Sequence, residues 1–199
     1  MKNTKLQYWL RVTHFAAILL LLALTPLGYI RTPILNITIL TVPIAICAIA
    51  LGPTAGAVLG FVFGLTSAWS AISGGGGMTT LLFNYNAVGT LVLCIVPRTL
   101  MGWLCGLVYK GAHRAFGDNI VSTILGSISA PLLNTALFMG TLVLLFSQSP
   151  VFAQIAGEKT AWLFVWGVFL SNGIAETIIC GIIGTAVSKT LLLVLKLRE

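Results

Sequence analysis

The sequence predicts an all-α membrane protein with six transmembrane helices. Of its 199 residues, 58% are hydrophobic and only 8% are charged, and the mean hydropathy is +1.04. A soluble domain carries about 25% charged residues, so this chain could not cover a surface that faces water. Its apolar residues form long continuous runs, whereas a transmembrane β-barrel would show short alternating segments. The same composition excludes a disordered chain, collagen and a disulfide-stapled scaffold.

Apolar runs and the residues that interrupt them place the six helices. A span needs about 20 apolar residues, so we expect one membrane domain over residues 1–199 and no separate soluble domain. Pro26 and Pro43 interrupt the first two runs, and Gly52-Pro53 predicts a tight turn between the second and third helices. The predicted spans lie near 8–25, 37–51, 53–71, 86–113, 118–147 and 160–196, with longer connections at 26–36, 72–85 and 148–159.

The first apolar run has the charge pattern of a signal peptide, because Lys2, Lys5 and Arg11 precede the apolar residues 15–24. No small-x-small cleavage site follows this run, which ends in the residues 25–28. We therefore expect a retained first helix.

Lysine and arginine residues collect on one side of the predicted bundle. With the N-terminus inside, eight of them face the cytoplasm, two face outward, and Arg98 lies within a span. Positive residues favour cytoplasmic loops, so both termini are predicted to be cytoplasmic in a multi-pass protein of the plasma membrane. The formal charge of +7 therefore reflects topology, and no nucleic-acid partner is expected. The cytoplasmic set is Lys2, Lys5, Arg11, Lys110, Arg114, Lys189, Lys196 and Arg198, and the outer set is Arg31 and Lys159.

No motif in the sequence predicts catalysis or a metal site. The four cysteines all fall in predicted spans without a CxxC pair, which favours a packing role over disulfides or metal ligands. His14 and His113 have no carboxylate at ligand spacing. There is no activated nucleophile, no working pair of carboxylates and no series of intramembrane carboxylates typical of an ion pump. We predict a binding protein rather than an enzyme.

Glycines recur at a strict spacing of four residues along the third span, at Gly52, Gly56, Gly60 and Gly64. Because lipid supplies little hydrophobic force between helices, close backbone approach through small residues drives helix packing. We expect this stripe to pack against another helix of the same chain. Docking to a partner protein is the alternative.

A second glycine run, at 74–77, lies in a predicted outer loop. It lacks the GxxxxGK[ST] pattern of a nucleotide site. A mobile lid over a small ligand and a plain flexible connection are the remaining interpretations.

Arg98 follows Pro97 inside the fourth predicted span. An arginine in the bilayer centre costs roughly 2.5–3.5 kcal/mol on insertion scales, so it should face the protein interior and have a partner. Glu176, near the middle of the sixth span, is the second intramembrane charge. Either the two residues form a structural ion pair, or Arg98 receives an anionic ligand, because its planar guanidinium suits a carboxylate. In the second case Glu176 would orient Arg98 or bind a ligand hydroxyl.

Asparagines add polar groups to the same helices. Asn172 lies four residues before Glu176 on one helical face, and Asn134 lies in the fifth span. Their amides suit the amide or hydroxyl groups of a ligand, and interhelical hydrogen bonding is the alternative. Asn84 and Tyr85 precede the fourth span, where ligand contact competes with helix capping as their role.

Three ordered motifs run through the second to the sixth span. They are the segment 43–67 with its Gly-Pro pair and glycine stripe, Val96-Pro97-Arg98 with Gly102, and Asn172-Gly-Ile-Ala-Glu176. Together they resemble the substrate-binding S component of energy-coupling factor (ECF) vitamin transporters. The resemblance is greatest to S components specific for pantothenate.

The resemblance implies the six-helix S-component fold, which riboflavin transporters also have, in a bacterial plasma membrane. It implies a transmembrane scaffold subunit and two cytoplasmic ATPases as partners, with ATP and magnesium bound by the ATPases and no cofactor in this chain. It also implies that the loaded S component topples in the membrane and releases its vitamin inward. In pantothenate-specific members, an arginine after proline and an asparagine in the next helix contact the ligand; they correspond to Arg98 and Asn134.

The first helix departs from the family pattern. S components usually present an Ala-x-x-x-Ala surface there to the scaffold subunit. The nearest match in this chain is Thr13-x-x-x-Ala17, with Ala16 adjacent. We expect these three residues to form the scaffold interface.

Pantothenate also suits the polar residues of the predicted site. Its carboxylate would pair with Arg98, and its amide and hydroxyls would use Asn134, Asn172 and Glu176. Folate would need aromatic platforms, of which the predicted site offers few, and riboflavin and pyridoxine need no arginine. The alternatives are one of these other vitamins, or a structural membrane subunit without a ligand in which Arg98 and Glu176 brace each other.

Overall fold

The computed structural model describes residues 4–25, 28–31, 36–157, 161–168, 170 and 173–196. Within them, five helices are long and apolar enough to span a membrane, and a sixth apolar helix is shorter. The expected α-helical membrane fold is therefore confirmed. The long helices are α1 (Thr4–Leu24), α3 (Pro53–Ile72), α5 (Ala87–Phe116), α6 (Ile120–Phe146) and a C-terminal segment over Ile174–Val194; the short one is α2 (Thr41–Leu51).

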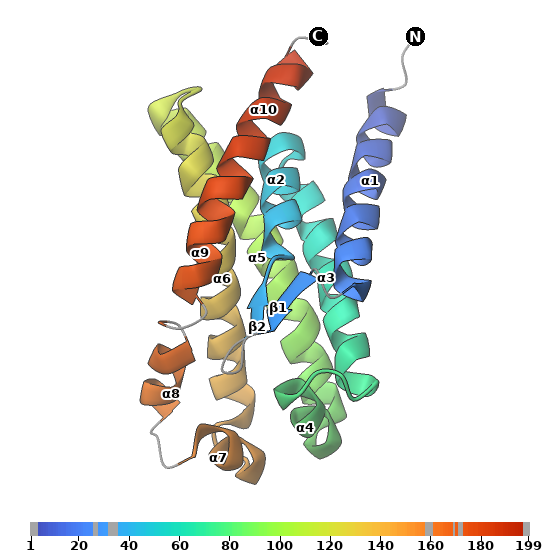
Figure 1. Ribbon diagram of the computed structural model, residues 1–199, viewed down its shortest axis with the longest axis vertical. Coiled ribbons are helices and arrows are strands. Elements are labelled where there is room, and N and C mark those ends of the chain that lie inside the picture. The colour runs from blue at the N-terminus through green and yellow to red at the C-terminus, as the bar shows by residue number, and fades with distance from the viewer. Residues whose placement is uncertain are drawn as a thin grey trace.

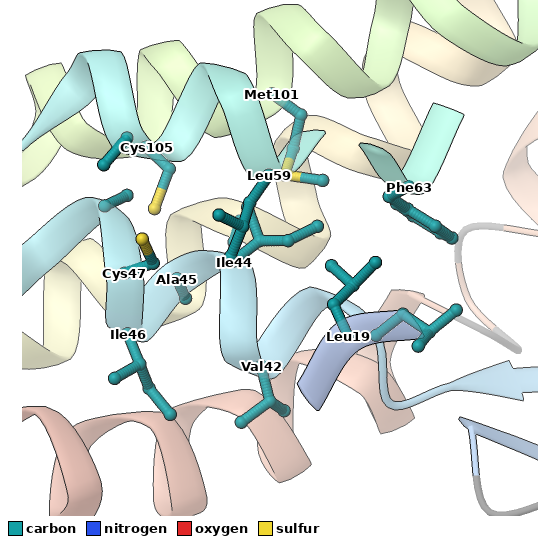
Figure 2. Packing of buried hydrophobic residues seen from close by; sticks show 14 of the residues in the cluster. Leu19, Val42, Ile44, Ala45, Ile46, Cys47, Leu59, Phe63, Met101 and Cys105 are labelled. Atoms are coloured by element: carbon teal, nitrogen blue, oxygen red, sulfur yellow. The ribbon is translucent and has the colours of Figure 1, made fainter. Parts of the chain in front are cut away.

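Helix α2 is the centre of the bundle. Nine of its 11 residues are buried, and it contacts α1, α3, α5, α6 and the C-terminal segment. Figure 2 shows Leu19, Leu59 and Met101, from three different helices, close to Ile44 of α2. An 11-residue helix is about 16 Å long, which is roughly half the thickness of the hydrocarbon core.

The prediction of a helix over 37–51 is wrong at its N-terminal end. Residues Asn36–Thr38 form β2, which pairs with β1 (Tyr29–Arg31) in an antiparallel hairpin. Helix α2 begins at Thr41, so Pro43 lies in the first turn, where a missing N–H breaks no helical hydrogen bond. In Figure 1 the hairpin lies below the N-terminal end of α2, at mid-height of the bundle.

Two of the predicted connections contain helices of their own. The connection over 72–85 includes α4 (Met78–Tyr85), and the one over 148–159 includes α7 (Pro150–Ala156). These two short helices contact each other. Figure 1 places them at the end of the molecule opposite to the start of α1 and the end of α10. Which of these ends faces the cytoplasm stays a prediction.

The chain over 160–196 differs from the single helix expected there. Its described residues form α8 (Ala161–Val168) and then α9 (Ile174–Ile179), a π-helical stretch (Cys180–Gly184) and α10 (Thr185–Lys196). Two glycines of the π-helical stretch lie close to α6: a Cβ atom at Gly181 or Gly184 would come within 3.2 Å of a side-chain atom of α6.

Helices α3 and α5 pack with their backbones in direct contact. A Cβ atom at Gly56 would overlap the carbonyl oxygen of Gly102, and one at Gly102 would overlap that of Gly56. A Cβ atom at Gly60 would overlap the carbonyl oxygen of Arg98, and one at Gly64 would lie 2.8 Å from the Cα atom of Ile95. Because only glycine leaves room for this approach, the stripe sets the depth at which α5 lies against α3.

Gly52 takes no part in this contact, contrary to the prediction. It separates α2 from α3 with φ 98°, and no described atom lies within 4 Å of a Cβ built on it. Side chains rarely adopt this positive φ. Gly52 is therefore the turn residue before Pro53, which starts α3.

Candidate functional site

Arg98 is buried inside α5 and is only 9% exposed. Its Nη1 atom donates a hydrogen bond to the carbonyl oxygen of Cys94 at 2.8 Å. The same Nη1 atom lies 3.5 Å from the carbonyl oxygen of Leu93. Leu93 lies four residues before Pro97, whose ring nitrogen carries no hydrogen for that carbonyl. The arginine side chain thus folds back along its own helix, toward the carbonyl that the proline releases.

Two aromatic rings lie against the guanidinium of Arg98. Its Cζ atom is 4.8 Å from the ring centre of Phe63 on α3 and 5.0 Å from that of Phe138 on α6. Both distances are within the range of a cation–π interaction, and both phenylalanines are buried. Neither phenylalanine was singled out by the sequence. No local signal in the sequence marks them, because they are two of ten phenylalanines in the chain.

Asn134 and Phe138 share one face of α6, because they are one helical turn apart. The Oδ1 atom of Asn134 is buried and has no hydrogen-bond partner among the described residues. Buried polar atoms are nearly always hydrogen-bonded in native proteins. This amide oxygen is therefore a group that a donor on a bound molecule would satisfy.

Glu176 is 5% exposed on α9. Its Oε1 atom accepts a hydrogen bond of 2.8 Å from the backbone N–H of Thr38. The carboxylate thus ties the hairpin strand β2 to α9. No ion pair joins Glu176 to Arg98 in the part of the chain that the structure describes. Thr38 was not a predicted site residue, and no local pattern marks it, because the two residues are 138 positions apart.

No contact among the described residues joins Asn84 or Tyr85, two of the other predicted ligand-binding residues, to Arg98. Asn84 and Tyr85 are exposed at the C-terminal end of α4. The helix cap at this junction is Asn86, whose Oδ1 atom accepts a hydrogen bond from the N–H of Gly89 at 3.0 Å. Asn172 lies outside the described residues.

The residues of the predicted scaffold interface lie on α1. Thr13 and Ala17 are exposed, whereas Ala16 is half-buried and packs against the main buried cluster. The hydroxyl of Thr13 donates a hydrogen bond to the carbonyl oxygen of Trp9 at 2.9 Å. Thr13 and Ala17 therefore present a narrow exposed stripe of small side chains.

The arrangement around Arg98 suits a small organic anion. A guanidinium carries five N–H donors, so Arg98 can hold backbone carbonyls and a carboxylate at the same time. Charge-assisted hydrogen bonds of this kind are the strong ones, and more so away from water. Among the described residues no group of three His, Cys, Asp or Glu side chains could hold a metal ion.

Two comparisons connect most of the chain to known proteins. The model of a family described as ECF transporter, substrate-specific component, matches residues 11–188. A relative from Leuconostoc mesenteroides subsp. mesenteroides, the pantothenate transporter PanT, is 31% identical over 192 residues. That alignment covers 92% of this chain and 90% of the relative. The similarity therefore extends well beyond the motifs around Arg98.

Proposed function

This chain belongs to the family of ECF transporter substrate-specific components, which are multi-pass proteins of the plasma membrane, and from this premise we propose that it binds pantothenate. Its family supports a role as the substrate-binding component of a vitamin transporter, and we propose no enzymatic activity for it. The name of its relative, pantothenate transporter PanT, supports the choice of this vitamin.

Two observations carry the proposal: the buried guanidinium of Arg98, and the Oδ1 atom of Asn134, which has no partner among the described residues. Asn134 lies one turn of α6 from Phe138, whose ring contacts that guanidinium. Pantothenate has one carboxylate, one amide and two hydroxyls. Its carboxylate pairs with Arg98, and its amide N–H or a hydroxyl donates to the Oδ1 atom of Asn134. Glu176 and Asn172 bind the remaining hydroxyl group of the vitamin. Asn84 and Tyr85 contact the vitamin at the edge of the site.

The partners follow from the family. A transmembrane scaffold subunit docks on the exposed stripe of α1 formed by Thr13 and Ala17, with Ala16 beside it. Two cytoplasmic ATPases bind ATP and magnesium, and this chain holds no cofactor. The loaded chain topples against the scaffold subunit and releases the vitamin inward.

Calorimetric titration of pantothenate into the purified chain, without partner subunits, tests this proposal. We expect saturable binding at one site. If pantothenate gives neither heat nor a thermal shift, a screen of folate, pyridoxine and riboflavin decides between another vitamin and a structural subunit. A shift with one of them would reassign the substrate, and no shift with any would favour a subunit without a ligand.

A further inference from the structure

We propose that Phe63 and Phe138 determine specificity: they hold the guanidinium of Arg98 in one plane, so that the site selects a carboxylate over a neutral hydroxyl at the same position. This inference rests on the proposed function, because it assumes that Arg98 receives the carboxylate of pantothenate. It assigns a role to two phenylalanines that contribute no polar group of their own.

Phe63 is held firmly on the α3 side of Arg98. It is 2% exposed and belongs to the main buried cluster. Figure 2 shows it to the right of Leu59 and Met101. The close contact of Gly60 with the backbone of Arg98 brings α3 against α5 at this depth. The ring therefore reaches the guanidinium because the glycine stripe lets the two helices touch.

Phe138 approaches from a different helix and a different part of the core. It lies on α6 and belongs to a second buried cluster with Leu93 and Leu142. Helix α5 packs against both α3 and α6, so the Arg98 side chain meets one ring from each neighbour. Neither ring can move away without disturbing its own cluster.

The orientation of the guanidinium matters more for a carboxylate than for an alcohol. A carboxylate forms two parallel hydrogen bonds with arginine, and both require the two planar groups to be aligned. A hydroxyl forms one hydrogen bond and tolerates rotation of its partner. The two rings and the Cys94 carbonyl fix the guanidinium before the ligand arrives. Carboxylate binding therefore carries no entropic penalty for ordering the guanidinium. Loss of one ring should therefore weaken carboxylate binding more than alcohol binding.

The experiment compares the dissociation constants of pantothenate and of pantothenol, in which a hydroxymethyl group replaces the carboxylate. The variants are Phe63→Met and Phe138→Met, which keep apolar volume but remove the ring, and Phe138→Tyr, which keeps it. Phe146→Met is the matched control, because Phe146 is 1% exposed in the second cluster and has no cation–π contact with Arg98 in the described structure. Thermal unfolding of each variant reports whether it is folded.

We expect the preference for pantothenate over pantothenol to fall about tenfold in each ring-to-Met variant, which is the size of the penalty for ordering one long side chain on binding. Phe138→Tyr should keep the preference of the natural chain, and Phe146→Met should keep it while lowering the unfolding midpoint. An unchanged preference in a folded Phe138→Met chain that still binds pantothenate overturns this inference and leaves the proposed function standing. A natural chain that binds neither compound overturns both.

Discussion

The Nη1 atom of Arg98 lies 3.5 Å from the carbonyl oxygen of Leu93, the carbonyl that loses its helical donor because residue 97 is a proline. The adjacent Pro97 and Arg98 thus have linked roles. The proline opens the hydrogen-bond ladder of α5, and the side chain of the next residue turns back toward the opening. The arginine is consequently oriented by its own helix before any ligand arrives.

Replacing Pro97 with alanine should raise stability and weaken binding. Alanine restores a backbone N–H that competes with Arg98 for the Leu93 carbonyl, and a proline inside a helix costs up to about 3 kcal/mol. We expect a higher unfolding midpoint and a several-fold weaker affinity for pantothenate, measured by thermal unfolding and calorimetry. Pro150→Ala, at the first position of α7, is the control and should leave the affinity unchanged. Unchanged affinity in Pro97→Ala would contradict this link.

The glycine stripe predicts a strongly position-dependent response to alanine. A Cβ at Gly60 would overlap the Arg98 carbonyl, whereas no described atom lies within 4 Å of a Cβ at Gly140 on α6. Gly60→Ala should destabilise the fold by about 1–3 kcal/mol through overpacking. Gly140→Ala should be neutral or stabilise by up to about 1 kcal/mol through helix propensity. Chemical or thermal unfolding of both variants checks this, and equal effects would count against direct backbone contact.

The hydrogen bond between Thr38 and Glu176 predicts that this carboxyl group anchors the hairpin. A hydrogen bond to a charged group contributes about 1.5–3 kcal/mol, so Glu176→Ala should speed amide hydrogen exchange at Thr38 by roughly tenfold or more. Glu176→Gln keeps an acceptor oxygen and should show a smaller effect. Thr177→Ala, which removes only a hydroxyl bonded to the Gly173 carbonyl on the same helix, is the control. Slow exchange at Thr38 in all three variants would refute the anchor.

Asn134 offers a test that separates a ligand contact from a structural one. Its buried Oδ1 atom has no partner among the described residues, and an unsatisfied buried polar group costs about 1–3 kcal/mol. Asn134→Leu should therefore keep or raise the unfolding midpoint without ligand, while binding of pantothenate weakens by about tenfold. Ser127→Ala removes another buried oxygen of α6 without a described partner and should leave binding unchanged. A large loss of stability in Asn134→Leu would instead indicate a structural amide.

Local patterns in the sequence were sufficient for the long helices α1, α3, α5 and α6 and for the approach of α3 to α5. The length of each apolar run places these helices. The glycines Gly56, Gly60 and Gly64 mark the surface of α3 that contacts α5. The start of α2 was misplaced because the apolar run continues through Ile37, and only pairing with β1 makes that segment a strand.

The site was predictable only for residues that are unusual in a membrane. Arg98 and Glu176 stand out as buried charges in apolar helices. Phe63 and Phe138 are two of ten phenylalanines in the chain, so their type carries no signal. Their role depends on three helices meeting at one guanidinium, which is a relation between distant segments that local periodicity does not record.

The central claim is that Arg98 binds the vitamin rather than bracing the fold, and one paired measurement addresses it. Pantothenate is titrated calorimetrically into the natural chain and into Arg98→Gln, with the unfolding midpoint of each protein recorded without ligand. We expect saturable binding to the natural chain, a loss of roughly a hundredfold or more in Arg98→Gln because a buried charge pair is broken, and nearly equal midpoints. Retained affinity in Arg98→Gln, or a lost affinity that accompanies a collapse of the midpoint, would contradict the claim.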